Sequence, residues 1–196
     1  MSNYDLVFVG HVTIDEIVAK EGSARATPGG APLFGVSAAL CLHKKLAIVT
    51  RMAEEDFHLL DPLKTAGVDI YLQHTQETTH MRVVHPTGNV DERWMYQTKD
   101  AGFFLIDEMP PIEPPCLIHC GALTDREFTL DFMRGLKERS FRLSVDMQSF
   151  VWQVDAETRM IRFMDVVGKK SIVGVVDFVK LDVVEAAILT GTDDLE

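Results

Sequence analysis

The sequence predicts an α/β fold in which helices connect the strands of a mostly parallel sheet. Short apolar runs that suit buried strands alternate with helical stretches, as in βαβ units. One pair of extended segments in the middle of the chain interrupts this alternation and predicts an antiparallel hairpin. The 196 residues, of which 46% are hydrophobic, are enough for one domain with a substantial core.

The first part of the chain predicts three buried strands separated by two helices. The strands are short apolar runs at 4–9, 46–50 and 68–72. The helices are predicted at 33–43, where small residues allow close packing on a sheet, and at 57–66. Gly67 directly follows the second helix and favours the left-handed backbone conformation that ends many helices.

Residues 79–98, THMRVVHPTGNVDERWMYQT, predict a hairpin that projects as a lid. β-Branched and aromatic residues flank the turn sequence PTGN. Met81 and Arg82 are neighbours on its first strand, so their side chains point to opposite faces, and one of them should face a bound ligand. The alternative is a solvated edge strand on which the arginine only prevents aggregation.

The last part of the chain predicts three further strands and two helices. The strands are predicted at 116–123, 142–148 and 178–181, and the helices at 124–140 and 183–190. Thr124 and Glu127 have the spacing of a capping box at the start of the first of these helices. Asp182 and Glu185 repeat that spacing at the start of the second.

The charge balance excludes some classes of partner. With 19 basic against 30 acidic residues the net charge is −11, which disfavours a broad surface for nucleic acid or anionic membranes. No apolar run approaches the roughly 20 residues that span a bilayer, and the N-terminus lacks the pattern of a signal peptide. The three cysteines form no evident disulfide framework. We therefore expect a cytoplasmic protein that binds neither nucleic acid nor a membrane.

Two conventional site motifs can be set aside. Gly29 and Gly30 precede a predicted helix, but their spacing matches neither the G-x-G-x-x-G pattern nor the P-loop, so a phosphate-binding turn is disfavoured. Cys116, His119 and Cys120 lie on a predicted strand, where neighbouring side chains point to opposite faces. A tetrahedral metal site would also need a fourth ligand, so we expect these residues to belong to a core strand.

Five segments, in order along the chain, resemble the ribokinase-like (PfkB-type) carbohydrate kinase family. They are 7–18, 28–57, 79–98, 145–151 and 179–196. The resemblance implies one three-layer α/β/α domain of Rossmann-like character over 1–196, with a small β-hairpin lid at about 79–98. It also implies that ATP and Mg²⁺ phosphorylate a hydroxymethyl group on a sugar, polyol or nucleoside that lies under the lid. Lids of this family often pair between subunits, which implies a homodimer.

The resemblance assigns roles to the residues that match the family's motifs. Substrate binding is implied for Asp15, Gly29, Gly30, Met81, Arg82, Asp146 and Gln148. Asp182 and Glu185 resemble the family's Asn-x-x-Glu element, which organises phosphate and Mg²⁺, so they imply a cofactor site with Glu185 as the residue nearest the metal. The alternatives remain open, because Asp15 could simply order a loop and Asp182 could simply cap a helix.

Two departures from the family pattern limit these expectations. Phe34 stands where the family commonly has an asparagine that contacts the substrate, and phenylalanine cannot hydrogen-bond. The Gly-rich GAGD motif, which supplies the family's general base and anion hole, does not occur in the 196 residues. We therefore expect the catalytic base to lie beyond Glu196 and this chain to carry the acceptor-binding half, inactive alone. The alternatives are a non-catalytic binder of sugars or nucleosides on the same fold and an unrelated nucleotide-binding α/β domain.

Overall fold

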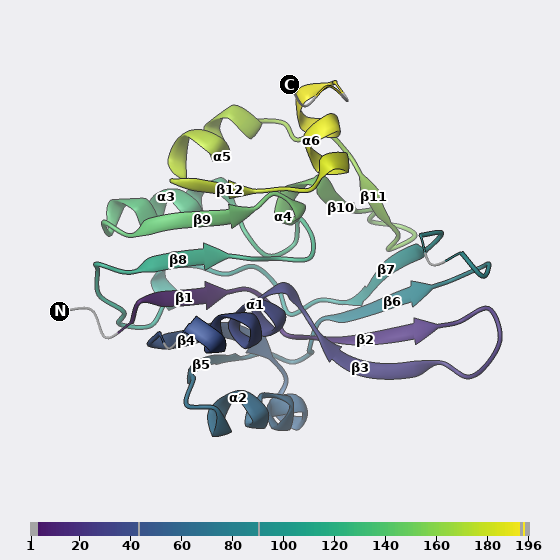
Figure 1. Ribbon diagram of the computed structural model, residues 1–196, viewed down its shortest axis with the longest axis horizontal. Helices are drawn as coiled ribbons and strands as arrows, with labels where there is room; N and C mark the ends of the chain where they lie inside the picture. Colours follow the sequence, from purple (N-terminus) through teal and green to yellow (C-terminus); the bar gives the residue numbers. More distant parts are fainter. Residues whose placement is uncertain (1–3, 43, 90, 193, 195–196) are drawn as a thin grey trace.

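A six-stranded parallel sheet forms the centre of the computed structural model, which describes residues 4–42, 44–89, 91–192 and 194 (Figure 1). The strands are ordered β12-β9-β8-β1-β4-β5, and every neighbouring pair is parallel. Their bounds are β1 (Leu6–Val9), β4 (Leu46–Met52), β5 (Asp69–His74), β8 (Leu117–Cys120), β9 (Arg142–Asp146) and β12 (Phe178–Lys180). Because all six run the same way, their carboxyl ends meet at one edge of the sheet.

Helices cover both faces of this sheet, which confirms the three-layer α/β/α architecture. The helices α1 (Ala31–Ala39) and α2 (Asp61–Thr65) pack on one face, and α3 (Leu130–Glu138) and α5 (Lys169–Val175) pack on the other. In Figure 1, α1 lies in front of the sheet and α3 behind it. Successive residues of a strand point to opposite faces, so Val7 and Val9 join the α3 side while Phe8 joins the α1 side.

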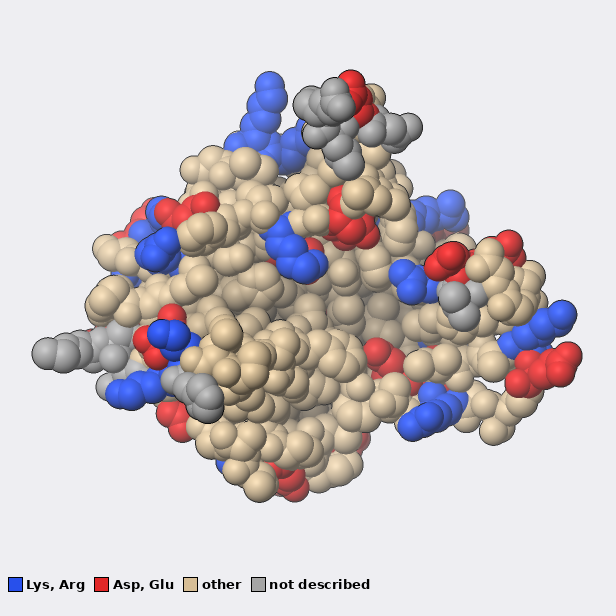
Figure 2. All heavy atoms as spheres, viewed as in Figure 1, with Lys and Arg blue, Asp and Glu red and all other residues tan. Residues whose placement is uncertain are grey.

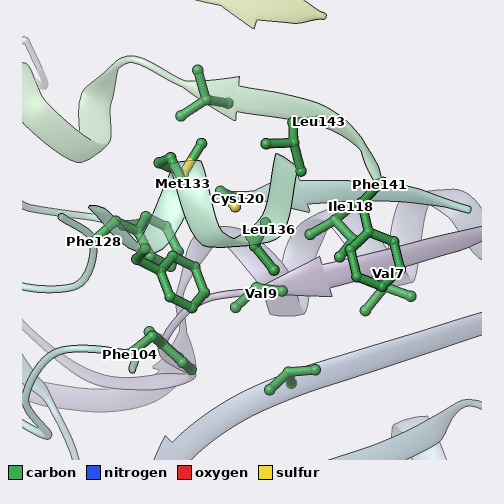
Figure 3. Close-up of a cluster of buried hydrophobic side chains, with 14 of the residues drawn as sticks. Val7, Val9, Phe104, Ile118, Cys120, Phe128, Met133, Leu136, Phe141 and Leu143 are labelled. Atoms are coloured by element: carbon green, nitrogen blue, oxygen red, sulfur yellow. The ribbon is translucent and has the colours of Figure 1, made fainter. Parts of the chain in front are cut away.

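The larger hydrophobic cluster lies between the sheet and α3 (Figure 3). Val9, Ile118 and Leu143 come from three adjacent strands and are fully buried beneath Met133 and Leu136 of the helix. Three phenylalanines extend the cluster toward the carboxyl edge of the sheet, with ring centroids 5.5 to 6.2 Å apart: Phe104, Phe128 and Phe132. Burial of alternate strand residues on both faces explains why these strands read as continuous apolar runs in the sequence.

A second sheet, here called the lid sheet, projects beyond the carboxyl edge of the first (Figure 1). Its strands are ordered β3-β2-β6-β7, with bounds β2 (Thr13–Val18), β3 (Arg25–Gly29), β6 (His80–Val84) and β7 (Trp94–Lys99). The pair β6–β7 is antiparallel, as the hairpin pattern predicts. The sequence patterns predict neither β2 nor β3, and β3 is an edge strand with mostly exposed residues whose composition resembles a loop.

A short antiparallel ribbon packs against the lid sheet. It consists of β10 (Trp152–Val154) and β11 (Ile161–Phe163). Val154 and Ile161 form a small buried cluster with Met81 and Met95 of the lid sheet. The backbone of Arg159 adds to this attachment, because its carbonyl accepts the N–H of Gln97 at 3.0 Å.

Most predicted helices shift in their bounds. The predicted helix at 33–43 is α1, which begins earlier, at Ala31, and passes into a 3₁₀ helix over Leu40–Leu42; residue 43 lies outside the described residues. The predicted helix at 57–66 is a 3₁₀ helix over Glu54–Leu60 followed by α2. The predicted helix at 183–190 is α6 (Val183–Thr190), with Gly191 in the left-handed conformation at its end. Within the described part of the chain, no helix has the length and apolar character that a membrane span requires.

The predicted capping box at Thr124 and Glu127 is wrong. The helix α3 starts at Leu130, and its N-cap is Thr129, whose side chain accepts the N–H of Phe132 at 3.1 Å. Residues 123–127 form a turn flanked by bends instead. The carboxyl group of Glu127 accepts hydrogen bonds from the backbone N–H groups of His11 and Leu123. It therefore makes tertiary contacts and does not have the helix-capping role that its spacing from Thr124 suggests.

Candidate functional site

The order of the strands reverses between β1 and β8, and this point lies directly beside the lid sheet. From β1 the chain continues outward to β4 and β5, and from β8 it continues in the other direction to β9 and β12. Open α/β sheets bind their ligands outside the carboxyl ends of the strands at such a point. Gly10 and Gly121 end the two strands here, and a Cβ atom on Gly10 would overlap the carbonyl oxygen of Gly121. The site therefore has a floor of closely packed backbone.

Asp15 lies on the face of the lid sheet opposite the one that carries Glu16 and Arg82. It belongs to β2, in register with Met81, which is buried against the β10–β11 ribbon. The sequence pattern predicts Asp15 just past a strand end, whereas in the structure it lies within β2. The hydroxyl of Thr13 donates to Oδ1 of Asp15 at 2.6 Å. Burial raises the pKa of the Asp15 carboxyl, and the Thr13 hydrogen bond partly offsets this.

Gly29 and Gly30 shape the space around this carboxyl group. A Cβ atom on Gly29 would overlap Oδ2 of Asp15, so any side chain there would displace the carboxyl group from this position. Gly30 has φ 104°, a conformation that favours glycine, and directly precedes α1. Phe34, on the first turn of α1, is 62% exposed and presents an apolar surface where the family pattern has an amide.

Met81 and Arg82 lie on opposite faces of the lid sheet, as the sequence predicts. Met81 is on the same face as Asp15 but is only 4% exposed. Arg82 is on the outer face, where its Nε lies 3.3 Å from Oε2 of Glu16 in a half-exposed ion pair. Arg82 is therefore separated from Asp15 by the sheet itself.

Asp146 and Gln148 lie farther along the carboxyl edge, at the end of β9. Asp146 is the last residue of the strand and is buried, and its Oδ1 accepts the backbone N–H of Gln148 at 3.3 Å. Gln148 opens the short helix α4 (Gln148–Val151) and reaches the carbonyl of Leu123, after β8, at 3.4 Å. Lys180, at the end of β12, donates to Oδ2 of Asp146 at 2.7 Å, and this bond raises the pKa of the lysine.

Asp182 and Glu185 form the capping box that their spacing predicts. Oδ1 of Asp182 accepts the N–H of Glu185 at 2.7 Å, and Oε2 of Glu185 accepts the N–H of Asp182 at 3.0 Å. Burial raises the pKa of the Glu185 carboxyl, and the neighbouring carboxylates of Asp182 and Asp146 act in the same direction. Three carboxyl groups thus gather near Lys180 at the ends of β9 and β12.

The carboxyl groups of this cluster are chemically suited to a hydrated Mg²⁺ ion. Mg²⁺ in phosphoryl-transfer sites is commonly held by one or two carboxylates together with water and substrate phosphates. The capping box uses one oxygen each of Asp182 and Glu185, which leaves the second oxygen of each for water or a cation. Among the described residues, no three His, Cys, Asp or Glu side chains are arranged to bind a metal by themselves. Any metal here would therefore depend on oxygen atoms supplied by water or a phosphate.

A buried polar joint that the sequence patterns do not predict lies where the lid sheet meets the core. The joint consists of the side chains of Glu127, His11 and Thr79, all at most 1% exposed. Oε2 of Glu127 accepts the backbone N–H of His11 at 2.7 Å, and Oε1 accepts that of Leu123 at 2.8 Å. Nδ1 of His11 lies 2.8 Å from Oγ1 of Thr79. No local motif reveals the joint, because its members are 48 to 116 positions apart in the sequence.

Burial disfavours the charged form of both titratable groups of the joint. It lowers the pKa of His11 to about 3 and raises that of Glu127 to about 8. Because the lowered pKa leaves the His11 ring uncharged near pH 7, the 3.7 Å separation between Nδ1 of His11 and Oε2 of Glu127 is not an ion pair. Neutrality suits the site, because an unpaired charge in such a place would cost several kcal/mol.

These two pKa shifts predict a stability maximum on the acidic side of neutrality. Glu127 binds a proton more tightly in the folded state, so its contribution to stability is lost as pH rises from 4.5 toward 8. His11 binds a proton less tightly when folded, so its contribution is lost as pH falls from 6.5 toward 3. The two effects oppose each other between 4.5 and 6.5. From 6.5 to 8 the free energy of unfolding should therefore decline through Glu127.

Urea unfolding at a series of pH values measures this decline. Glu127→Gln should remove it between pH 6.5 and 8, because glutamine does not titrate. Glu138→Gln, at the exposed end of α3, is the control and should keep it. A decline of unchanged slope in Glu127→Gln would contradict the assignment.

Three cavities of about 490 to 570 Å³ lie outside the region around Asp15. One lies at the tip of the lid sheet, beside His85 and Thr87. One lies between β12, α5 and α6, and one lies on the outer face of the lid sheet beside Trp94 and Arg159. The candidate site is instead the recess between the core and the lid sheet, which is visible in Figure 2.

The known proteins to which the chain is similar include several kinases. No protein-family model matches the chain. A cytidine kinase from Thermococcus kodakarensis is 28% identical over 171 residues, which cover 77% of this chain and 59% of that protein. The chain thus spans about three fifths of the length of its curated relative.

The similar solved structures also include kinases. A pyrophosphate-dependent kinase in the ribokinase family, solved as a sulfate complex, is 27% identical with a TM-score of 0.88, covering 97% of this chain and 66% of that one. A structure of such a kinase with a pyrophosphate analog and myo-inositol has a TM-score of 0.86 at 26% identity, covering 97% and 65%. A fructokinase from Vibrio cholerae O395 is 17% identical with a TM-score of 0.67, covering 100% and 65%, and shows the fold alone.

Proposed function

The chain has the ribokinase-like fold, and on this premise we propose that it forms the acceptor side of a cytoplasmic carbohydrate kinase. The reaction transfers a phosphoryl group from ATP, with Mg²⁺, to a hydroxymethyl group of a sugar, polyol or nucleoside. One observation carries the proposal: a partly buried carboxyl group, Asp15, lies in β2, on the lid-sheet face that carries the buried Met81, and β2 directly follows β1, beside which the strand order reverses. A carboxylate in that position can accept hydrogen bonds from two neighbouring hydroxyl groups.

Each part of the proposed site has a distinct chemical task. Asp15 orients the acceptor, and the backbone at Gly29 and Gly30 lets the acceptor approach closely. Asp146 and Gln148 line the carboxyl edge beyond it. Asp182 and Glu185 would hold Mg²⁺ through water, and the ion would neutralise charge on the transferred phosphoryl group. The general base is the part that the family's GAGD motif supplies, which these 196 residues do not contain.

The relatives suggest which acceptors and donors to test. One relative is a cytidine kinase, and another was solved with myo-inositol and a pyrophosphate analog. Phosphorylation by the natural polypeptide that contains this chain should be assayed with cytidine, myo-inositol, ribose and fructose, each with ATP or pyrophosphate and Mg²⁺. Transfer to one of these acceptors from ATP supports the proposal, and transfer from pyrophosphate alone would correct the donor.

A non-catalytic sugar or nucleoside binder on the same fold is the alternative function. Calorimetric titration of the 196-residue chain with the same four compounds separates the two. Binding without any phosphorylation by the natural polypeptide would favour the binder. Absence of both would remove Asp15 from an acceptor site altogether.

We further propose that the outer face of the lid sheet pairs with a second copy of the chain. Trp94, which is 50% exposed, lies on this face together with Tyr96 and Arg82. They line the cavity of about 490 Å³ described above, which a partner side chain could fill. Sedimentation of the protein with and without Trp94→Ser tests this idea, and a monomer at all concentrations of the unmodified protein would refute it.

A further inference from the structure

We propose that the buried polar joint fixes the orientation of the lid sheet, with Glu127 as a positioning residue for Asp15. The part that concerns Asp15 rests on the proposed function, whereas the part that concerns the lid sheet does not. The inference comes from the way in which the chain passes between the two sheets.

The chain crosses between the core and the lid sheet four times, and all four crossings meet at His11. The first enters β2 through Gly10 and His11, and the second leaves β3 at Gly30. A Cβ atom on Gly30 would overlap the carbonyl oxygen of His11, so these two crossings are in direct contact. The third enters β6 at Thr79, and the fourth leaves β7 through residues 100–102.

Hydrogen bonds of one small network connect the first, third and fourth crossings. Nε2 of His11 donates to the carbonyl of Gly102 at 3.0 Å, which fixes the tautomer. Nδ1 of the ring then accepts the hydroxyl hydrogen of Thr79 at 2.8 Å. The same hydroxyl oxygen accepts the backbone N–H of Ala101 at 3.0 Å. The imidazole donates one hydrogen bond and accepts one, and the hydroxyl group does the same, so every bond of the network has a defined direction.

Glu127 attaches this network to the core. Its two carboxyl oxygens accept the N–H of His11, in the first crossing, and that of Leu123, just after β8. Its own carbonyl accepts the N–H of Phe104, which continues the fourth crossing, at 2.9 Å. Phe104 is 1% exposed and belongs to the main hydrophobic cluster, so this end of the network is held in the rigid core.

Directed hydrogen bonds determine an angle in a way that apolar packing does not. Asp15 lies only four positions after His11, on the strand that this crossing enters. A small rotation about the crossings would therefore move its carboxyl group relative to Gly10 and Gly121 at the carboxyl edge. We infer that loss of the joint alters the placement of Asp15 before it abolishes folding.

Two substitutions remove the joint with little change in shape. In Glu127→Gln the amide NH₂ group faces one of the two backbone N–H donors. An NH₂ group cannot accept a hydrogen bond, so that backbone N–H loses its acceptor. Thr79→Val keeps the volume but removes the hydroxyl that two groups share. Thr79→Ser restores the hydroxyl and is the conservative rescue. Leu136→Ala, in the core beneath α3, destabilises the protein without touching the joint.

Spin-label distance measurement reports the lid orientation independently of any activity. Cys41 on the core is exposed, whereas Cys116 and Cys120 are buried, so Cys41 accepts a label selectively. Gly88 at the lid tip is exposed, and a Cβ atom there meets nothing within 4 Å, so Gly88→Cys supplies the second site. We expect one narrow distance distribution in this background, in Thr79→Ser and in Leu136→Ala. Glu127→Gln and Thr79→Val should broaden or shift it.

Titration with cytidine and with myo-inositol completes the test. Where the background protein binds either compound, Glu127→Gln and Thr79→Val should weaken binding about tenfold, as loss of preorganisation predicts. Leu136→Ala should not. Unchanged distances in folded Glu127→Gln and Thr79→Val would overturn the joint. Altered distances with unchanged affinity would refute only the role of Glu127 in positioning Asp15. A background protein that binds neither compound would refute both that role and the proposed function.

Discussion

Asp15→Asn should lower kcat/KM for the acceptor about 100-fold without lowering the stability of the fold. Hydrogen bonds to a charged acceptor contribute about 1.5–3 kcal/mol each, and the carboxylate is proposed to accept two of them from the acceptor hydroxyls. Asparagine keeps an oxygen for the Thr13 hydroxyl, so the local structure of β2 should persist. Because burial raises the pKa of Asp15, the neutral amide also relieves a desolvation cost.

The neighbouring Glu16 provides a matched control for this experiment. Glu16 lies on the opposite face of β2 and pairs with Arg82 in an exposed ion pair, which contributes little to stability. Glu16→Gln should therefore leave kcat/KM unchanged. Steady-state kinetics with the acceptor identified in the panel above measures both variants. Equal activity of Asp15→Asn and Glu16→Gln would remove Asp15 from the site.

Gly30→Ala should cause the largest loss of stability, about 3–5 kcal/mol. The φ of 104° costs a residue with a side chain about 1–3 kcal/mol, and the new Cβ atom would overlap the carbonyl oxygen of His11. A loss of this size is a large part of the roughly 5–15 kcal/mol that stabilise a domain. The cause is local, because the second crossing can relieve the overlap only by moving away from the buried polar joint.

Gly22→Ala separates the two contributions. Gly22 has a similar φ, 119°, but a Cβ atom there would meet nothing within 4 Å. It should therefore show the cost of backbone strain alone, measured as the free energy of unfolding in urea. If Gly30→Ala and Gly22→Ala lowered the free energy of unfolding by the same amount, the overlap with the carbonyl oxygen of His11 would contribute nothing to the loss.

The sequence predicted the elements whose signals are local. The strand at 46–50 is an unbroken apolar run because both of its faces are buried, and it became β4. The capping box at Asp182 was predictable because its donors and acceptors lie within four consecutive residues. Spacing alone distinguishes Gly29 and Gly30 from the phosphate-loop patterns, whereas the contact between Gly29 and Asp15 required the structure.

The predictions from sequence were wrong or incomplete where contacts between residues far apart in the chain determine the structure. Thr124 and Glu127 satisfy the same local rule as Asp182 and Glu185, yet Glu127 bonds to His11, 116 positions earlier. The strand β3 has few buried residues of its own, and it exists because it pairs with β2 at the edge of the lid sheet. In both cases the deciding energy comes from contacts that no window of neighbouring residues contains.

The parallel pairing of β1 with β8 has a consequence for the order in which the protein can be assembled during synthesis. Leu6 is in register with Leu46 on one side and with Leu117 on the other. Strand β1 therefore keeps one open edge until residues 117–120 have been made, and the contact between His11 and Glu127 must wait still longer. Nascent chains that end before residue 117 should thus expose the central strand of the sheet, which makes this stage the one at which a chaperone has most to protect.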